Sequence, residues 1–404
     1  MAPAANLKNV VRNIGLVVAS TFLSFLVAEW SVRTFYPQQL AVWYTTEDGI
    51  VIHPPGLTTY LTEFKQEIRF NALGMRDRDH AKAKPANTTR ILVFGDSFME
   101  ALQIAFEDSF PSLLESGLRQ RLQRNVEVIN CAVSGWGQAD QLAYLRKYGK
   151  ALEPDLILVV MTLHNDVFDN MEEKFFTLVN GKLITKPVVR RSSAEWMILR
   201  IKGFFASRSH LWQLLRKWKH LGKTRNAATA LDKHVMQLIS GNEETAELKR
   251  GWSLTFELFK AIQAVGKSLG AQTAIMLIPL KLQLQDDSFD DFIRSAGILK
   301  NNVIIEKSQR KMQAFGQDVN IQIIDLLPSF REWTVRQRTR ETKPSLHLNE
   351  GHWNEKGHRL AAHIAIQEIV ERQLAEVNSP VVSLSPSVQQ PSGDGPHVAP
   401  SPDR

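Results

Sequence analysis

Ser97 is the residue of this chain whose setting best suits nucleophilic catalysis. It stands in ILVFGDSFMEALQI, where an apolar run leads through Gly-Asp into a helix-like stretch. A strand-to-helix turn of this kind projects the serine hydroxyl above a sheet and aims backbone N–H groups at any oxyanion that forms there. Asp96 is expected to brace the turn through local hydrogen bonds. Because serine also caps helices for structural reasons, the motif needs support from elsewhere in the chain.

That support comes from two hydrogen-bond donors that follow other apolar runs. Gly135 lies in NCAVSGWGQADQ, and Asn165 lies in VVMTLHNDVFDN with Asp166 in a supporting role beside it. A glycine N–H and an asparagine side-chain amide both suit the oxyanion of a tetrahedral intermediate. Taken singly, they are also explained as a turn glycine and an Asx-capped loop. Their joint arrangement with Ser97 favours an oxyanion hole.

His352 is the expected general base. It precedes an amphipathic stretch in LHLNEGHWNEKGHRLAAHIAIQEIV and therefore lies in a loop. A serine hydroxyl is a poor nucleophile at neutral pH and needs a base within hydrogen-bond reach, which a neutral imidazole provides. His358 and His363, farther along this stretch, are expected to face solvent or to pack on the helix.

A parallel sheet covered by helices is expected to position these residues. Short β-branched runs alternate with amphipathic stretches such as 110–122 and 254–269, the pattern of an α/β domain. Gly95 and Gly135 lie just past the carboxyl ends of two strands, where open parallel sheets hold their active sites. The predicted fold is a three-layer α/β/α sandwich with a five-stranded parallel sheet. Its predicted strands are 90–94, 126–130, 155–161, 272–278 and 320–325.

The N-terminal segment predicts one transmembrane helix. Residues 13–28 carry no charge, Trp30 and Tyr36 suit a membrane interface, and Lys8 and Arg12 favour a cytoplasmic N-terminus. A cleaved signal peptide and a buried amphipathic helix are the alternatives, but no small-x-small cleavage site follows the apolar run. We therefore expect an uncleaved, single-pass signal anchor with the rest of the chain on the extracytoplasmic side.

The chain divides into four predicted parts. Residues 1–36 form the anchor, 37–89 form a lead-in segment, and 90–377 form the main domain. Residues 378–404 are rich in serine, proline, valine and glycine, a composition typical of a disordered tail. In the lead-in, FKQEIRFNALGMRDRD predicts an extended segment followed by an Asn/Gly turn.

A basic insertion at about 170–250 separates the third and fourth predicted strands. Between residues 190 and 225 it holds ten lysines or arginines against one acid, Glu195, interleaved with tryptophan and phenylalanine. We interpret it as a solvated helical pair that packs its aromatic rings on the body. Contact with a membrane surface or with an acidic polymer is the alternative.

Composition limits the partners and cofactors. A net charge of +7 suits nucleic acid, an anionic membrane or an acidic glycan, but no nucleic-acid-binding signature is present, so no nucleic-acid partner is expected. No closely spaced Cys/His cluster suits zinc, and we expect no metal and no cofactor. The single cysteine, Cys131, is expected at a buried strand end and leaves the compartment undecided.

The motifs GDSF, SGWG, HND and GHWN resemble, in order, the four blocks of the SGNH (GDSL-like) hydrolase superfamily. The likeness covers about residues 68–375, and RFNALGMRDRD with RILVFGDSF is similar to its membrane-anchored bacterial branch. The resemblance implies a flavodoxin-like sandwich, a bacterial inner-membrane location with a periplasmic catalytic domain, and esterase chemistry with Ser97 as nucleophile and His352 as base. The implied oxyanion hole comprises the N–H groups of Ser97 and Gly135 and the side chain of Asn165.

Two positions depart from the family pattern. Leu163 stands where the third block usually has glycine, and Asn349 stands where the triad acid is commonly an aspartate. A close variant places the acid two residues before the histidine, so we assign Glu350, whose carboxylate would orient the imidazole of His352. The alternatives are an exposed Glu350 with the imidazole held by a backbone carbonyl, and Asp325 at the end of the fifth strand.

The leading hypothesis is a serine esterase or deacylase acting on ester-linked acyl groups, notably acetyl groups, of an envelope or extracellular glycan. A tethered enzyme outside a membrane meets acylated polysaccharides there. An O-acetyltransferase in polysaccharide assembly would use the same acyl-enzyme. A non-catalytic envelope protein that binds glycans or holds an assembly complex is a third hypothesis, and a lipid esterase is a fourth. The expected partners are an acylated glycan, the membrane and polysaccharide assembly proteins.

Overall fold

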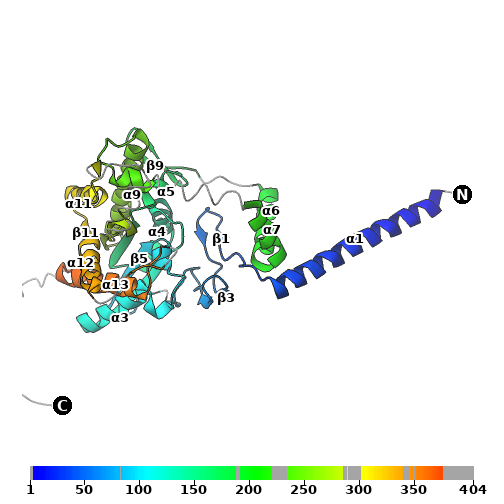
Figure 1. Cartoon of the computed structure of the whole chain (residues 1–404), viewed down its shortest axis with the longest axis horizontal. Coiled ribbons are helices and arrows are strands. Elements are labelled where there is room, and N and C mark those ends of the chain that lie inside the picture. The colour runs from blue at the N-terminus through cyan, green and yellow to red at the C-terminus, as the bar shows by residue number, and fades with distance from the viewer. Residues whose placement is uncertain are drawn as a thin grey trace, which may run out of the picture.

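The computed structural model consists of a body of helices and strands from which the N-terminal helix extends (Figure 1). The described residues are 3–81, 83–187, 192–220, 234–284, 289, 302–339, 345–348 and 351–375. The predicted tail at 378–404 and parts of the basic insertion lie outside them.

A five-stranded parallel sheet forms the centre of the body and confirms the predicted fold class. Its order is β11-β10-β7-β5-β6, which in chain order is the flavodoxin-like arrangement 2-1-3-4-5. The direction of winding reverses between β5 and β7, and at such a switch point the loops leave room for a site. The strands are β5 (Thr88–Gly95), β6 (Asn125–Ala132), β7 (Leu156–Thr162), β10 (Gln272–Ile278) and β11 (Gln322–Asp325).

Helices cover both faces of this sheet because side chains alternate along each strand. On β5, Ile91 and Val93 join the apolar cluster on one face, whereas Leu92 and Phe94 join the cluster on the other. The first face is covered by α3 (Phe110–Leu122), α12 (Leu327–Arg338) and α13 (Glu355–Glu371). The second is covered by α4 (Gln138–Leu152), α9 (Ala246–Ser268) and α11 (Lys307–Val319).

The lead-in segment forms two small antiparallel pairs and then a tight turn. The strands are β1 (Tyr44–Thr45), β2 (Val51–Ile52), β3 (Thr58–Leu61) and β4 (Gln66–Arg69). At the predicted turn, the side-chain oxygen of Asn71 accepts hydrogen bonds from the N–H groups of Leu73 and Met75. Gly74 has a φ of +72°, and a Cβ there would lie 2.3 Å from a backbone oxygen of His53, so the turn requires glycine.

The N-terminal helix α1 (Pro3–Phe35) contains an apolar run, Asn9–Phe35, that is long enough to cross a membrane. A signal sequence would meet the same criteria. Helices α6 (Ser193–Arg208) and α7 (His210–His220) form a hairpin beside the carboxyl-terminal end of α1 (Figure 1). A further antiparallel pair, β8 (Phe176–Val179) and β9 (Lys182–Thr185), precedes this hairpin in the chain.

Candidate active site

Ser97 begins the short helix α2 (Ser97–Glu100) directly after β5. Asp96 precedes it as the N-cap, and its carboxylate accepts a hydrogen bond of 3.0 Å from the N–H of Phe98. Gly95 lets the chain turn closely, since a Cβ there would lie 2.5 Å from Met99 Cγ. Ser97 is half-buried while its neighbours on both sides are fully buried, so the turn presents the serine at the surface.

His352 lies against Ser97 although 255 positions separate the two residues. Its Nε2 is 2.8 Å from Ser97 Oγ, within normal hydrogen-bond reach. The loop is held from both sides, because the carbonyl of His352 accepts a 2.7 Å bond from the N–H of Leu348 and Asn354 caps α13. The imidazole also packs on the ring of Phe98, with centroids 5.1 Å apart.

Gly135 and Asn165 lie at the same edge of the sheet as Ser97. They follow β6 and β7, the two strands that flank β5, and parallel strands end at a common edge. Gly135 has a φ of +80°, which favours glycine. Asn165 Nδ2 donates a 2.6 Å hydrogen bond to Asp169 Oδ2, which fixes the side-chain amide at this edge.

Buried carboxyl groups lie behind this edge of the sheet. Burial raises the pKa of Asp96, and it raises that of Asp166 strongly, with the nearby Asp96 and Asp169 adding to the effect. Burial likewise raises the pKa of Asp169 to about 6. Asp166 accepts hydrogen bonds from Gln138 Nε2 at 2.6 Å and from the N–H of Thr162 at 3.1 Å. Asp166 therefore braces the start of α5 (Asp166–Asn170), the helix that follows Asn165.

Neither Glu350 nor Asp325, the two candidates for the triad acid, is seen beside His352 in the part of the chain that the structure describes. Glu350 and its neighbour Asn349 lie outside the described residues. Asp325 ends β11, three strands from β5 or about 14 Å at the usual strand spacing. Its carboxylate accepts a 3.0 Å bond from the N–H of Leu327, so Asp325 is engaged at the start of α12. Leu163, at the family glycine position, is fully buried in the core.

Glu100, which was not predicted as a site residue, joins the lead-in segment to the carboxyl edge of the sheet. Glu100, the last residue of α2, is fully buried, and its carboxylate accepts hydrogen bonds from the N–H of Ser134 at 3.0 Å and from its hydroxyl. The other carboxylate oxygen contacts Nε2 of the buried His53. His53 Nδ1 donates to the carbonyl of Val42 at 2.7 Å. Because both ring nitrogens face acceptors, the imidazole is held at both ends.

Arg76 is a second missed residue, although it lies in the lead-in motif RFNALGMRDRD. Its guanidinium is buried and donates to the carbonyls of Glu100, Ala101 and Ile104, which closes the carboxyl end of α2. Ala101 has a left-handed backbone, with a φ of 54°. Burial lowers the pKa of Arg76 to about 10, so the group stays charged at neutral pH. Arg76 thus holds α2, and with it Ser97, from the far end.

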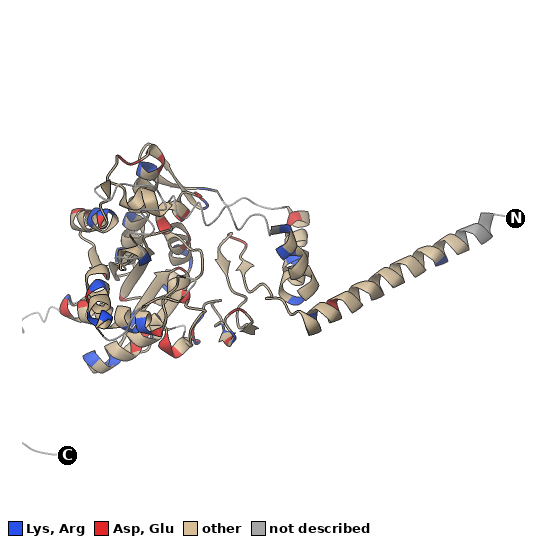
Figure 2. Cartoon of the chain, in the orientation of Figure 1, with Lys and Arg blue, Asp and Glu red and all other residues tan. Residues whose placement is uncertain are grey.

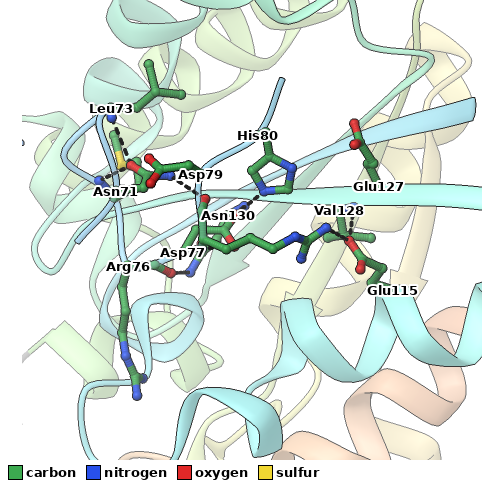
Figure 3. Close-up of polar contacts among 12 residues, drawn as sticks. Asn71, Leu73, Arg76, Asp77, Asp79, His80, Glu115, Glu127, Val128 and Asn130 are labelled. Atoms are coloured by element: carbon green, nitrogen blue, oxygen red, sulfur yellow. Dashed lines mark hydrogen bonds and ion pairs between the residues drawn. The ribbon is translucent and has the colours of Figure 1, made fainter. Parts of the chain in front are cut away.

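The rest of the motif fastens the lead-in to β6 (Figure 3). Asp77 accepts bonds of 2.9 Å from the N–H of Asn130 and from His80 Nε2. The side chain of Asn130 donates to the carbonyls of Arg76 and Met99. These contacts join the motif, β6 and α2 into one buried network. A further link, outside this network, runs from Arg78 through Glu115 to the N–H of Val128.

Three further histidines near the site, half-buried or buried, are neutral at physiological pH. Burial lowers the pKa of His164 to about 4 and those of His347 and His358 to about 3. His358, expected at the sequence level to face solvent or to pack on its helix, accepts a 3.2 Å bond from the N–H of Phe110. His363 is exposed. Among the described residues, no group of three His, Cys, Asp or Glu side chains suits a metal ion.

Comparison with curated proteins finds one local similarity, and no protein-family model matches the chain. An arylesterase from Vibrio mimicus is 32% identical over 113 residues, which are 28% of this chain and 54% of that protein. The chain therefore spans about half the length of this curated relative.

Several solved structures, esterases among them, align with this chain at low TM-scores. TesA is 12% identical, with 70% of this chain and 98% of that chain covered and a TM-score of 0.33. The psychrotrophic esterase EstA from Pseudoalteromonas sp. is 13% identical, with 71% and 98% covered and a TM-score of 0.33. The acetylxylan esterase Axe2 from Geobacillus stearothermophilus is 13% identical, with 70% and 94% covered and a TM-score of 0.35. Scores this low carry no functional inference.

Proposed function

We propose that this chain is a serine ester hydrolase of the SGNH superfamily, held at a membrane by α1. The observation that carries the proposal is the 2.8 Å contact between His352 Nε2 and Ser97 Oγ at the carboxyl edge of the sheet. The local 32% identity to an arylesterase supports the same chemistry. Gly135 and Asn165, which follow the strands on either side of β5, supply the donors that such chemistry needs.

The geometry supports acyl transfer through an acyl-serine. His352 Nε2 takes the proton of Ser97 Oγ as the oxygen attacks the ester carbonyl, and the oxyanion is held by the N–H groups of Ser97 and Gly135 and by Asn165 Nδ2. The protonated imidazole then gives its proton to the leaving alcohol. Water attacks the acyl-serine by the same route in reverse, losing a proton to His352, which returns it to Ser97 as the acid is released.

We propose Glu350 as the carboxylate that orients His352, as the family variant implies. In that role the carboxylate would accept a hydrogen bond from Nδ1 and stabilise the imidazolium that forms during each proton transfer.

The contacts of α1 favour a retained anchor over a cleaved signal peptide. The carboxylate of Glu29 accepts bonds of 2.8–3.0 Å from Ser209 Oγ and from the N–H groups of His210 and Leu211. It thus caps the start of α7, and Arg33 also donates to the carbonyl of Arg208 at 2.8 Å. Cleavage after Phe35, where the span ends, would remove Glu29 and with it the cap of α7.

The proposed substrate is an ester-linked acyl group, notably acetyl, on an envelope or extracellular glycan. The support is the tether, because a body fixed at the outer face of an inner membrane is confined to substrates of the envelope. The low charge of α1 and the basic residues at its N-terminal side fit an orientation with the body in the periplasm.

The test is hydrolysis of nitrophenyl acetate by the full chain in detergent. Replacement of Ser97 by alanine is expected to lower kcat by about 10³-fold or more, since removal of a nucleophile abolishes the acyl-enzyme route. Ser116→Ala is the matched control, because Ser116 is an exposed serine of α3, away from the site. Equal rates for the wild type and Ser97→Ala would overturn the proposal.

The fate of the acyl group separates hydrolysis from transfer to a sugar. With an acetylated glycan as donor and a deacetylated glycan as acceptor, the proposal predicts that free acetate accumulates and the acceptor stays unmodified. Acetate on the acceptor, lost in Ser97→Ala, would show that the acyl-serine delivers its group to a sugar hydroxyl instead.

A further inference from the structure

The outer face of helix α6 is apolar and uncovered by the body. Every residue of α6 is exposed or half-exposed. Met197, Ile198 and Ile201 follow the i, i+1, i+4 spacing of one helical face, and between 48% and 58% of each side chain is exposed. A helix of this composition is stable when its apolar side meets an apolar partner.

The body occupies the opposite face of α6. There Trp196 and Arg200 line a groove of about 740 Å³ whose other wall includes Trp43 and Tyr44 of the lead-in segment. The face with Met197, Ile198 and Ile201 therefore points away from the body.

Helix α7 repeats the pattern. Leu215 and Trp218 lie three positions apart on one face and are 50% and 69% exposed. Basic residues lie along both helices (Figure 2), and several of them border the groove toward the body. The basic residues are Arg200, Lys202, Arg208, Arg216, Lys217 and Lys219. Helices that carry exposed tryptophan and aliphatic side chains together with lysine and arginine are typical of a membrane interface.

The hairpin is fastened to the end of the apolar helix α1. Glu29 of α1 caps the start of α7, and Arg33 donates to the last residue of α6, Arg208. Gln38 and Ala41, just beyond α1, bond to His210 Nδ1 at 2.9 Å and to the carbonyl of Ala206 at 2.8 Å. The hairpin lies between the end of α1 and the body (Figure 1). If α1 crosses a bilayer, these bonds place the hairpin at the surface of that bilayer.

We propose that the α6–α7 hairpin is a second membrane contact, lying in the interface of the bilayer that α1 crosses. Its apolar faces enter the boundary between headgroups and acyl chains, and its lysines and arginines contact anionic lipid headgroups. An acidic polysaccharide fits less well, because it would leave the exposed apolar side chains of both helices in water. The hairpin would hold the body at a fixed height and orientation, with the edge that carries Ser97 at a set distance from the membrane.

The test measures the depth of the hairpin in vesicles that contain the full chain. Cys131 is the single cysteine and is fully buried, so one introduced cysteine gives one accessible label site. A polarity-sensitive fluorophore is attached to Met197→Cys on the hairpin, to Phe22→Cys in α1 and to Val335→Cys, which is 63% exposed on α12 of the body. The vesicles contain phosphatidylcholine and phosphatidylglycerol, with and without a nitroxide on the lipid acyl chain.

The expected result is quenching by the lipid nitroxide that is about threefold or more stronger at position 197 than at 335, since interfacial helices enter the boundary by about 5–10 Å. Quenching at 22 but equal, weak quenching at 197 and 335 would overturn the proposal while leaving the anchor intact. Protection of position 197 from aqueous iodide only when a soluble acidic polysaccharide is added would overturn it in favour of a glycan. Circular dichroism of each variant verifies folding, and the readout is independent of esterase activity.

Discussion

The carboxylate of Glu100 accepts hydrogen bonds from both the backbone N–H and the hydroxyl of Ser134, and so ties helix α2 to the loop after β6. Ser97 begins that helix and Gly135 directly follows Ser134. The bond therefore fixes the proposed nucleophile relative to a proposed oxyanion donor. His53 secures the carboxylate from the lead-in segment, which makes residues outside the main domain part of the support of the site.

Glu100→Ala is expected to lower kcat by about 10- to 100-fold with a much smaller change in KM. The substitution leaves Nε2 of the buried His53 and the N–H of Ser134 without partners, at a cost of roughly 1–3 kcal/mol, and frees the loop that carries Gly135. A loosened oxyanion donor weakens the transition state more than the bound ester. Steady-state kinetics with nitrophenyl acetate measure the two constants.

The matched variant is Glu100→Gln, which keeps the shape of the side chain. Its oxygen still accepts from Ser134, and its amide donates to Nε2 of a neutral His53, so activity is expected within about threefold of the wild type. If both variants lose stability equally while kcat is unchanged, Glu100 has a structural role and does not position the site.

Asn165→Ala is expected to lower kcat by about 10²-fold or more, the usual effect of removing one oxyanion donor. Asp169→Ala, which removes the partner that fixes the amide of Asn165, is expected to have a smaller effect because the donor itself remains. Asn125→Ala, at an exposed residue that begins β6, is the control. A larger loss for Asp169→Ala than for Asn165→Ala would contradict the assigned roles.

Arg76→Lys is expected to lower the free energy of unfolding by about 2 kcal/mol or more, since a single ammonium nitrogen cannot replace the two guanidinium nitrogens that reach carbonyls in different places. Activity should fall as well, because α2 loses its hold at Ala101. The control is Arg69→Lys at an exposed ion pair with Asp79, where a change within about 0.5 kcal/mol is expected. Denaturant unfolding in detergent measures both variants.

The sheet and the Ser97–His352 pair were predictable because their signals are local. Each strand is a short β-branched run, and β10 spans the predicted residues 272–278. Helix α3 likewise spans the predicted 110–122. The serine and the histidine stand in motifs whose order along the chain indicates a shared site. Adjacent parallel strands then bring Gly135 and Asn165 to that edge whatever the details of the loops.

The buried supports of the site were not predictable because each depends on a partner distant in the chain. Glu100 is an ordinary helix residue in sequence, and only its burial against His53 and Ser134 reveals its role. Arg76 lies in RFNALGMRDRD, yet no residue near it in the sequence shows that its guanidinium reaches the carbonyls at and beyond the end of α2. The outer face of α6 is a similar case, since its aromatic neighbours were expected to pack on the body.

His358→Gln is expected to make the folded chain less sensitive to acid. Burial lowers the pKa of His358 from 6.5 to about 3, so between these values the unfolded chain binds one proton more than the folded chain does. Stability contributed by the neutral imidazole is therefore complete above pH 6.5 and is lost as the pH falls toward 3, by up to about 1.4 kcal/mol per pH unit.

Glutamine retains an acceptor for the N–H of Phe110 and removes the titration, which should reduce the slope of unfolding free energy against pH by that amount. Denaturant unfolding between about pH 4 and about pH 7, a range that crosses the pKa of the unfolded imidazole, measures the slope, with His363→Gln, an exposed residue of the same helix, as control. A slope in His358→Gln equal to that of the wild type would show that the imidazole is not neutral in the folded chain.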